Sequence, residues 1–175
     1  TSATAASVKA AVDAGHKHPD IPEYKDYDAY RAAGGYSLLD ECLAGKRTPD
    51  ELIEIMSGSG MRGLGGAGFP TGTKWNIVRG EAKPRLMAVN ADEGEPGTFK
   101  DKLYLESDPH RMLEGMLIAA WVVEAETVYI YLRDEYPGIR EVLLQEIAKV
   151  EAAGLDRVTK IELRRGAGAY ICGEE

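Results

Sequence analysis

Cysteine, histidine and positive charge are scarce in this chain, and each shortage excludes a class of function. The chain has only two cysteines, Cys42 and Cys172, which are far apart and form no Cys-x-x-Cys pair. Together with three scattered histidines they offer no metal-ligand spacing, so we expect no metal site within the chain. A disulfide between the two cysteines is one alternative, but the reduced thiols of a cytoplasmic protein are favoured.

Basic residues are outnumbered by acidic ones. Lys and Arg total 21 against 29 Asp and Glu, which gives a formal charge of −8. Nucleic acids and anionic membrane surfaces are bound through clustered Lys and Arg, so we expect neither as a partner. An anionic ligand would have to be held by local backbone dipoles and a few cations.

Long apolar segments are missing as well. The longest apolar run, 116–123, is far too short to span a bilayer, which argues against membrane insertion. The Ala-rich start, 1–15, lacks a basic beginning and an apolar core, so we do not expect a secretion signal. Because the chain has no initiator Met, we expect it to be an excised piece of a longer polypeptide.

Glycine, by contrast, is concentrated in one stretch. Five glycines fall in the ten positions from Gly63 to Gly72, and Lys74 follows them. Glycine is tolerated where the backbone approaches a ligand closely, and exposed N–H groups beside a lysine suit a phosphate. A flexible linker is the alternative, but the interleaved Phe69 and Trp75 are untypical of linkers. We therefore interpret this stretch as a ligand-binding loop.

The residues before this loop predict a helix. Thr48 has the character of an N-cap, Pro49 fits the first helical position, and the helix should run through Met56 to the glycines at 58–60. The segment 63–68 fits Gly-x-Gly-x-x-Gly, but that dinucleotide fingerprint requires a preceding strand. The ordinary fingerprint is therefore disfavoured here.

The upstream segment is predicted to be partly helical. We expect short helices at 5–14 and 36–43 and an irregular surface segment over the remainder of 1–35. Tyrosines recur at every third position in this segment, and we expect them to pack onto the domain rather than to form a binding stripe. They are Tyr24, Tyr27 and Tyr30.

Downstream of the glycine loop, strand and helix patterns alternate. Short apolar or alternating segments at 85–90, 127–133 and 158–164 predict strands, and Val, Ile and Tyr enrich the second. Ser107-Asp108-Pro109 should cap a long helix, and a second helix should run from Pro137 to Ala153. The order predicts an α/β fold, a Rossmann-like parallel sheet with flanking helices. A short, mainly helical segment, 1–62, would precede the domain at 63–175.

Two of the predicted strands end in dense polar chemistry. Residues 90–98 and 166–175 combine glycines with carboxylates and an amide or a phenol, which suits a polyhydroxylated ligand. A solvated acidic turn is the alternative for the first stretch, and a loop leading into another helix is the alternative for the second. The five acids also raise the alternative of a Mg²⁺ site. The glycine loop lacks the Lys-Ser/Thr ending of a P-loop, so phosphoryl transfer is the weaker hypothesis.

Three motifs, in this order, give the chain a resemblance to a known family. They are Gly-Gly-Ala-Gly-Phe-Pro-Thr-Gly-x-Lys-Trp, Asn-Ala-Asp-Glu-x-Glu-Pro-Gly-Thr-Phe-Lys-Asp and Arg-Gly-Ala-Gly-Ala-Tyr-Ile-Cys-Gly-Glu-Glu. Over 52–175 the chain resembles the FMN- and NADH-binding subunit of respiratory NADH dehydrogenase, the 51 kDa family. The same module occurs in diaphorase subunits of NAD-reducing hydrogenases and of soluble NAD-dependent formate dehydrogenases, and the N-terminal segment is most similar to the formate dehydrogenase type.

The resemblance implies a set of cofactor-binding residues and no catalytic residue, because the flavin carries the chemistry of hydride transfer. The residues expected to bind FMN are Gly63, Gly65, Gly66, Lys74, Asn90, Asp92, Glu93, Gly173 and Glu174. Those expected to bind NADH are Phe69, Glu95, Tyr170 and Glu175. Three positions depart from the family pattern: Leu64 and Lys102 stand where Arg is common, and Ile77 stands where an aromatic residue is common.

The resemblance also implies a multisubunit setting. Electrons would pass from FMN to iron–sulfur centres elsewhere, with a thioredoxin-like [2Fe–2S] subunit and an iron–sulfur/molybdenum catalytic subunit of formate dehydrogenase as partners. A [4Fe–4S] cluster is expected only in a C-terminal part beyond this chain, so the domain 63–175 would be incomplete. The alternatives are the equivalent subunit of NADH:quinone oxidoreductase or of NAD-reducing hydrogenase, and a truncated, non-catalytic assembly module.

Overall fold

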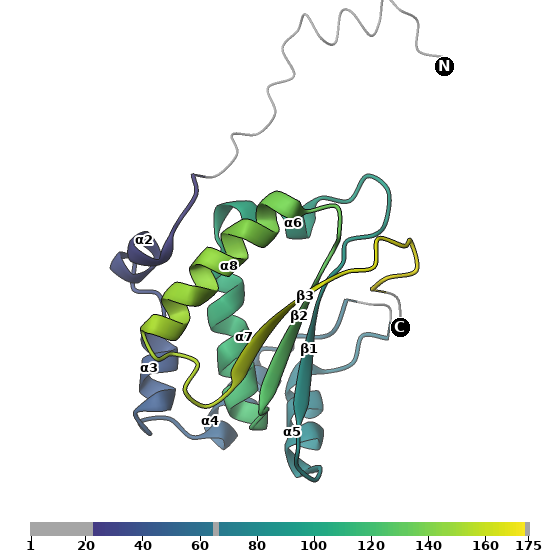
Figure 1. The fold of residues 1–175 in the computed structure, drawn as a ribbon. Coiled ribbons are helices and arrows are strands. Elements are labelled where there is room, and N and C mark those ends of the chain that lie inside the picture. The colour runs from purple at the N-terminus through teal and green to yellow at the C-terminus, as the bar shows by residue number, and fades with distance from the viewer. Residues whose placement is uncertain (1–22, 65–66, 174–175) are drawn as a thin grey trace, which may run out of the picture.

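The computed structural model describes residues 23–64 and 67–173, and the helix predicted at 5–14 lies outside this part. The described elements alternate between helices and strands after a helical start (Figure 1). The helices are α2 (Tyr27–Ala32), α3 (Ser37–Leu43), α4 (Pro49–Gly58), α5 (Thr71–Gly80), α6 (Lys100–Ser107), α7 (Pro109–Val123) and α8 (Pro137–Ala152). The strands are β1 (Leu86–Ala91), β2 (Thr127–Leu132) and β3 (Lys160–Arg165).

The three strands form one parallel sheet in the order β1-β2-β3. The register brings Leu86 opposite Thr127 and Thr127 opposite Lys160, so the strands begin and end together. The helical segments α6–α7 and α8 make the two crossovers, and Figure 1 shows α7 and α8 on one side of the sheet. The predicted α/β fold with a parallel sheet and flanking helices is confirmed. All three carboxyl strand ends meet at one edge, where ligands bind in open α/β sheets.

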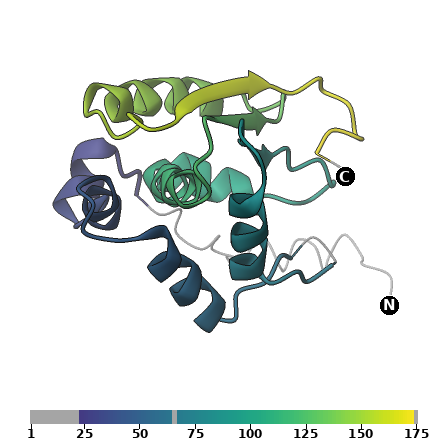
Figure 2. The same ribbon diagram turned by 90° about the horizontal axis from the view of Figure 1, so that it is seen from below.

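Buried and partly exposed side chains alternate along β2, which explains why α7 and α8 cover one face of the sheet. Val128, Ile130 and Leu132 are fully or almost fully buried, while Tyr129 and Tyr131 on the other face remain partly exposed. Successive residues of a strand point to opposite faces, so one face of β2 supplies the core. The partners are the apolar stripes of α7 and α8, and Figure 2 gives the same arrangement seen from below.

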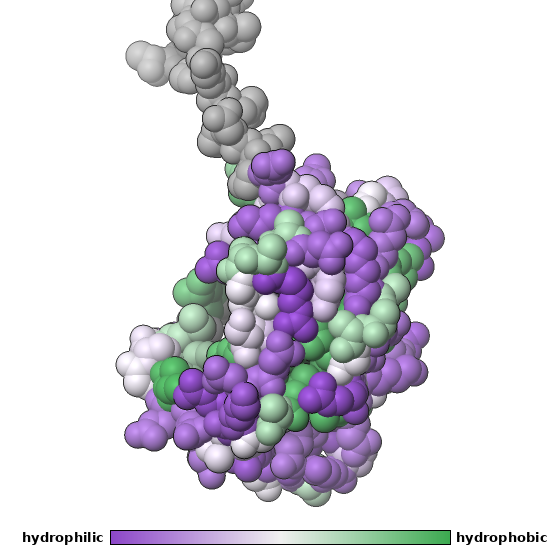
Figure 3. All heavy atoms as spheres, turned by 90° about the vertical axis from the view of Figure 1, so that its left-hand side faces the viewer, coloured by the Kyte–Doolittle hydropathy of each residue, from purple (hydrophilic) through white to green (hydrophobic). Residues whose placement is uncertain are grey.

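The N-terminal helices pack onto the same core. Tyr36, Leu39 and Leu52 are buried in one hydrophobic cluster with the residues of α7 and the sheet. Figure 3 shows a largely hydrophilic surface on the outer face of this region, with hydrophobic residues in separate patches. The capping predicted at Thr48 is confirmed: its hydroxyl accepts from Glu51 N, and Glu51 accepts in return from Thr48 N.

A buried polar network fastens this N-terminal part to α7 and α8. His110 Nε2 lies 2.7 Å from Glu146 Oε2, and His110 Nδ1 lies 2.8 Å from the Tyr36 hydroxyl. Tyr24 OH donates to Glu146 Oε1 at 2.9 Å, and Tyr27 N donates to Oε2 at 3.1 Å. The tyrosine spacing noted in the sequence therefore does pack onto the domain, as predicted.

Three helices differ from the sequence-based expectation. Residues 27–32, expected to be irregular, form α2, because Asp26 caps the helix by accepting from Ala29 N. No helix was predicted at α5 or α6, and α6 is a short helix with almost no amphipathic pattern. The start predicted for α7 is confirmed, because Asp108 is its N-cap and Pro109 its first residue, but Asp108 makes no side-chain capping bond. Ser107 does not cap α7, since it ends α6 and its hydroxyl donates to Leu103 O.

Candidate functional site

The glycine-rich stretch forms a closed turn between α4 and α5. Gly63 N donates to Phe69 O at 2.9 Å, and Thr71 N donates to Met61 O at 3.0 Å. The Arg62 guanidinium donates to Gly68 O at 2.9 Å. These bonds tie the two sides of the stretch together, and Leu64 is fully exposed. Gly65 and Gly66 lie outside the described residues.

The turn leads directly into the N-terminus of α5. The N-cap is Pro70, which has no side-chain acceptor, and no other described side chain caps this helix end. The first turn carries Lys74 and no acidic residue. The first N–H groups of a helix lack intrahelical partners and carry partial positive charge. The N–H of Thr71 is taken by Met61 O, but no described side chain caps the N–H groups that follow it. These N–H groups and the exposed lysine fit a phosphate group.

The N-terminus of α5, the candidate phosphate site, lies toward the carboxyl ends of the strands. In Figure 1 the chain descends through α5 and then returns upward through β1. The N-terminus of α5 therefore lies on the side of the sheet where β1 ends. Close packing fixes α5 against α4, because a Cβ added at Gly72 would lie 2.2 Å from Ser57 Oγ and 2.7 Å from Ser57 N.

Asn90 joins the two polar strand-end loops that the sequence singled out. Its Nδ2 donates to Gly173 O at 2.6 Å, and its Oδ1 accepts from Asp92 N at 3.0 Å. Gly173 has φ +82°, and a Cβ there would lie 2.8 Å from Asp92 O, so only glycine lets the two loops approach this closely. Residues 90–95 and 166–173, distant in sequence, thus share one site. Glu174 and Glu175 lie outside the described residues.

A small hollow of about 230 Å³ opens between these loops. Tyr170 OH donates to Glu95 Oε1 at 3.0 Å across the site, and both residues are exposed. Burial raises the pKa of Asp92, with Glu135 adding to the effect and Arg133 opposing it. The hollow is lined by Asp92, Gly94, Pro96, Arg133, Glu135, Ala169 and Tyr170.

Glu93 differs from its acidic neighbours because its side chain points inward. The residue is 5% exposed. Its carboxylate accepts from Asp101 N at 3.1 Å, Lys102 N at 3.3 Å and Tyr136 OH at 3.1 Å. Burial alone would raise the pKa of Glu93, but these hydrogen bonds outweigh it and hold the pKa below its ordinary value.

Sequence reasoning missed the contribution of β2 to the site. The Tyr131 hydroxyl accepts from Ala167 N at 3.1 Å, and the Arg133 guanidinium donates to Glu93 O. A hydrogen bond with Tyr131 lowers the pKa of the Cys172 thiol. The sequence could have predicted this contribution. In a parallel sheet the second predicted strand ends at the same edge as the first and the third, so the residues at its end lie beside the same site.

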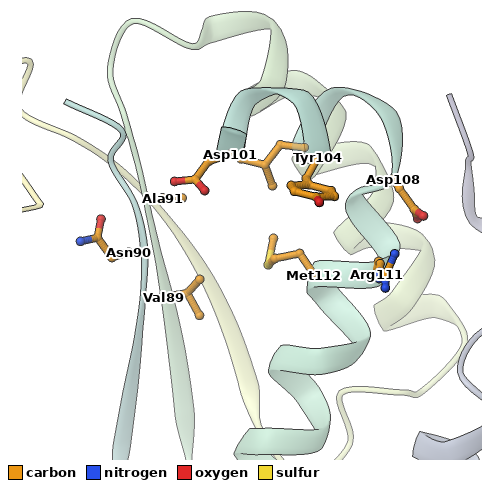
Figure 4. A pocket seen from close by; sticks show the side chains of 9 residues that line it. Val89, Asn90, Ala91, Asp101, Tyr104, Asp108, Arg111 and Met112 are labelled. Carbon is orange, nitrogen blue, oxygen red and sulfur yellow. The ribbon is translucent and has the colours of Figure 1, made fainter. Parts of the chain in front are cut away.

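A second cavity, of about 350 Å³, lies between β1 and the helices α6 and α7. Figure 4 shows Val89 and Met112 pointing into it, whereas Asn90 points away from it, to the other side of β1. Its lining is mainly apolar and includes the charged residues Asp101, Asp108 and Arg111, and the sequence patterns did not predict it. Asn90 is therefore directed to the loop site described above and not into this cavity.

The described residues hold no group of three or more His, Cys, Asp or Glu arranged to bind a metal ion. Glu174 and Glu175, two of the five acids of the Mg²⁺ alternative, lie outside these residues. Among the same residues, no helix is both long and apolar enough to cross a bilayer.

Comparisons with known proteins converge on one family. A family model described as the Nuo51 FMN-binding domain, Complex1_51K, matches residues 56–175. The F 2 subunit of NADH-quinone oxidoreductase in Rhizobium meliloti (strain 1021) is 44% identical over 168 residues, covering 91% of this chain and 40% of that protein. The corresponding F subunit of Escherichia coli (strain K12) is 40% identical over 158 residues, covering 85% of this chain and 35% of that protein.

A solved structure is also similar to this chain. A chain of an NAD⁺-reducing [NiFe]-hydrogenase in the H2-reduced state superposes with a TM-score of 0.72 at 32% identity. The match covers 99% of the present chain and 33% of the hydrogenase chain. The present chain thus spans well under half the length of the proteins that it matches.

Proposed function

Because the chain belongs to the family of the Nuo51 FMN-binding domain, we propose that it binds FMN and NADH at the carboxyl edge of its sheet. The reaction would be hydride transfer between the two, and bound FMN would supply its redox chemistry. The protein's part is to bind both molecules and to orient their rings. The single observation that carries the proposal is that Asn90 joins the two strand-end loops, on the side of the sheet where α5 begins with no side-chain cap among the described residues.

The phosphate of FMN would lie against α5 and the glycine turn. Gly63, together with Gly65 and Gly66 outside the described part, would present backbone N–H groups. Lys74 would neutralise the phosphate, since it is exposed and has no acidic neighbour in its helical turn. Helix N-termini bind phosphate well, which supports this placement.

The rest of the flavin would meet the joined loops. Asn90, Asp92 and Gly173 would line the ribityl chain and ring system, and Glu174 would close over them from outside the described part. Glu93 would contribute by holding its loop in place, because its carboxylate oxygens already accept protein hydrogen bonds.

NADH would be bound by more exposed groups. Phe69 is 46% exposed and Tyr170 63% exposed, so both present rings to solvent for stacking. Glu95 lies beside Tyr170, and Glu175 would join it from outside the described residues. Two carboxylates near the adenosine ribose would repel a 2′-phosphate and favour NAD over NADP. Because Ile77 replaces an aromatic residue, stacking of the adenine would be one-sided.

The relatives also bear on which multisubunit enzyme this chain would belong to. Relatives named as subunits of NADH-quinone oxidoreductase, and the likeness to an NAD⁺-reducing hydrogenase, make these two systems the preferred parents over a formate dehydrogenase. In either, electrons would leave through iron–sulfur centres, including a [2Fe–2S] partner subunit and a [4Fe–4S] cluster in a further part of the polypeptide. A molybdenum-containing catalytic partner would apply only to the formate dehydrogenase alternative.

Flavin analysis of the protein purified in its native assembly tests the proposal. We expect stoichiometric FMN to be released on denaturation, and Lys74→Ala to weaken FMN binding about tenfold through loss of a charge-assisted contact. Lys46→Ala, at another exposed lysine, is the matched control. Absence of flavin from the wild-type assembly would instead favour the non-catalytic assembly module.

A further inference from the structure

Tyr131 lies on the sheet face opposite α7 and α8, at the end of the middle strand. In the register of the sheet it is paired with Asn90 on β1 and with Arg164 on β3. Its neighbours Ile130 and Leu132 are buried toward the helices, so the partly exposed Tyr131 ring lies on the other face. Tyr131 therefore stands beside Asn90 at the carboxyl edge of the sheet.

The Tyr131 hydroxyl contacts the loop after β3, residues 166–173, near both of its ends. It accepts from Ala167 N at 3.1 Å, at the start of the loop. It also hydrogen-bonds the thiol of Cys172, near the end of the loop, which lowers the pKa of Cys172 and raises the pKa of Tyr131. A phenol oxygen can donate one hydrogen bond and accept another, so a single atom serves both contacts.

The loop also closes on the Cys172 sulfur from its own backbone. Cys172 N donates to Ala169 O at 2.9 Å, which forms a turn at the end of the loop. Hydrogen bonds from the backbone of Ala169 and Ala167 add to the effect of Tyr131 in lowering the pKa of Cys172, while burial and the charge of Asp92 oppose them. The sulfur is thus a point at which both ends of the loop meet, and Tyr131 fastens that point to β2.

We propose that Tyr131 is a positioning residue, which joins the two ends of the loop 166–173 and fastens them to the sheet without touching a ligand. Asn90 Nδ2 bonds only the far end of the loop, at Gly173 O. Ala169 and Tyr170 lie between the two ends and line the hollow of about 230 Å³. The end of β2 therefore decides where these two residues lie.

The inference rests on the proposed function, because the loop is one of the two that would meet FMN and NADH. Neither the three sequence motifs nor the proposed ligand contacts include Tyr131. The competing explanation is a direct contact between Tyr131 and a ligand. For its hydroxyl, such a contact would replace a bond that the loop already makes.

Tyr131→Phe removes the hydroxyl and keeps the ring. Ala167 N loses an acceptor and the Cys172 sulfur loses a partner, so the loop should open more often. We expect hydrogen exchange in residues 166–173 to become about fivefold to tenfold faster, the effect of losing one ordinary hydrogen bond. The pH profile of Cys172 alkylation by iodoacetamide should move to higher pH, since the thiolate loses its stabilising partner. The KM for NADH should rise about threefold, with a smaller change in kcat.

Tyr129→Phe is the matched control. Tyr129 precedes Tyr131 by two positions on the same face of β2, and the Arg164 guanidinium lies 5.3 Å from its ring centroid. A further variant, Cys172→Ala, removes the sulfur and leaves Tyr131 in place. Because Tyr131→Phe and Cys172→Ala break the same contact, their effects on exchange should be less than additive in the double variant.

All variants are measured in the native assembly, by mass spectrometry of the peptides that contain residues 166–173 and by NADH oxidation kinetics. The expected result is that Tyr131→Phe speeds exchange and shifts the alkylation profile, while Tyr129→Phe does neither. A raised KM in Tyr131→Phe with exchange as slow as in the wild type would overturn the inference in favour of direct contact. Additive effects of Tyr131→Phe and Cys172→Ala on exchange would also overturn it. Absence of FMN from the wild type would reject the proposed function separately, and exchange and alkylation would still decide whether Tyr131 holds the loop.

Discussion

Replacing Glu146 tests how the N-terminal part is held on the domain. The Glu146 side chain is 2% exposed, and two donors reach each of its oxygens. Tyr24 OH and Lys149 Nζ lie 2.9 and 2.8 Å from Oε1, and Tyr27 N and His110 Nε2 lie 3.1 and 2.7 Å from Oε2. In Glu146→Gln, one oxygen becomes an amino group and faces donors that it cannot accept from.

The size of the effect follows from which contacts are lost. The amino group should replace Oε1, because Lys149 is 42% exposed and can be solvated, whereas His110 is fully buried. The loss is then one hydrogen bond to a charged group plus a screened ion pair, about 2 kcal/mol in total. For a domain of this size, that lowers the Tm by about 4–8 °C.

The pH dependence has a definite sign. Burial raises the pKa of Glu146, but hydrogen bonds from Lys149, His110, Tyr24 and the backbone outweigh it, so the folded-state pKa lies below the ordinary value. The stabilisation is therefore fully present above the unfolded pKa of about 4.3 and is lost as the pH falls through the folded pKa. The gap between wild type and Glu146→Gln should be constant near neutral pH and shrink below about pH 4.

Urea unfolding and hydrogen exchange provide the assay. We expect a lower free energy of unfolding and faster exchange in residues 23–36, whose contacts converge on Glu146. The control is Glu41→Gln, since Glu41 pairs with Arg47 at the surface and should contribute less than about 0.5 kcal/mol. The reasoning would be refuted if Glu146→Gln lowered the free energy of unfolding no more than Glu41→Gln does. Unchanged hydrogen exchange in residues 23–36 would refute it as well.

Three further predictions concern packing and the site. Gly72→Ala should destabilise the protein by about 1–3 kcal/mol in thermal unfolding, because the new Cβ would meet backbone of α4, whereas Gly80→Ala, with open space around it, should not. Asn90→Asp should lower the FMN content of the purified assembly, because a carboxylate would face Gly173 O in place of a donor; unchanged content would contradict this. Glu95→Ala should increase the use of NADPH relative to NADH in steady-state kinetics, and an unchanged ratio would remove the charge-repulsion argument.

Patterns within a single segment were sufficient for much of the fold. The alternation of apolar strands and longer helices predicted the parallel sheet, and Thr48 with Pro49 marked the start of α4. A helix predicted before the glycine turn disfavoured the ordinary dinucleotide fingerprint, and α4 does precede that turn. By contrast, α5 and α6 were missed because their stability comes from packing, as at Gly72, and from Glu93 at the start of α6.

The sequence by itself determined the succession of strands and helices after the glycine turn, the location of that turn, and the polar stretches that follow β1 and β3. Only the tertiary structure decided that Asn90 reaches Gly173, and that Glu93 faces inward while Glu95 faces outward. Local patterns report the period of an element and its ends. They do not report hydrogen bonds between groups that are forty or more positions apart, such as Glu93 with Tyr136, because such contacts form only when the sheet brings its strand ends together.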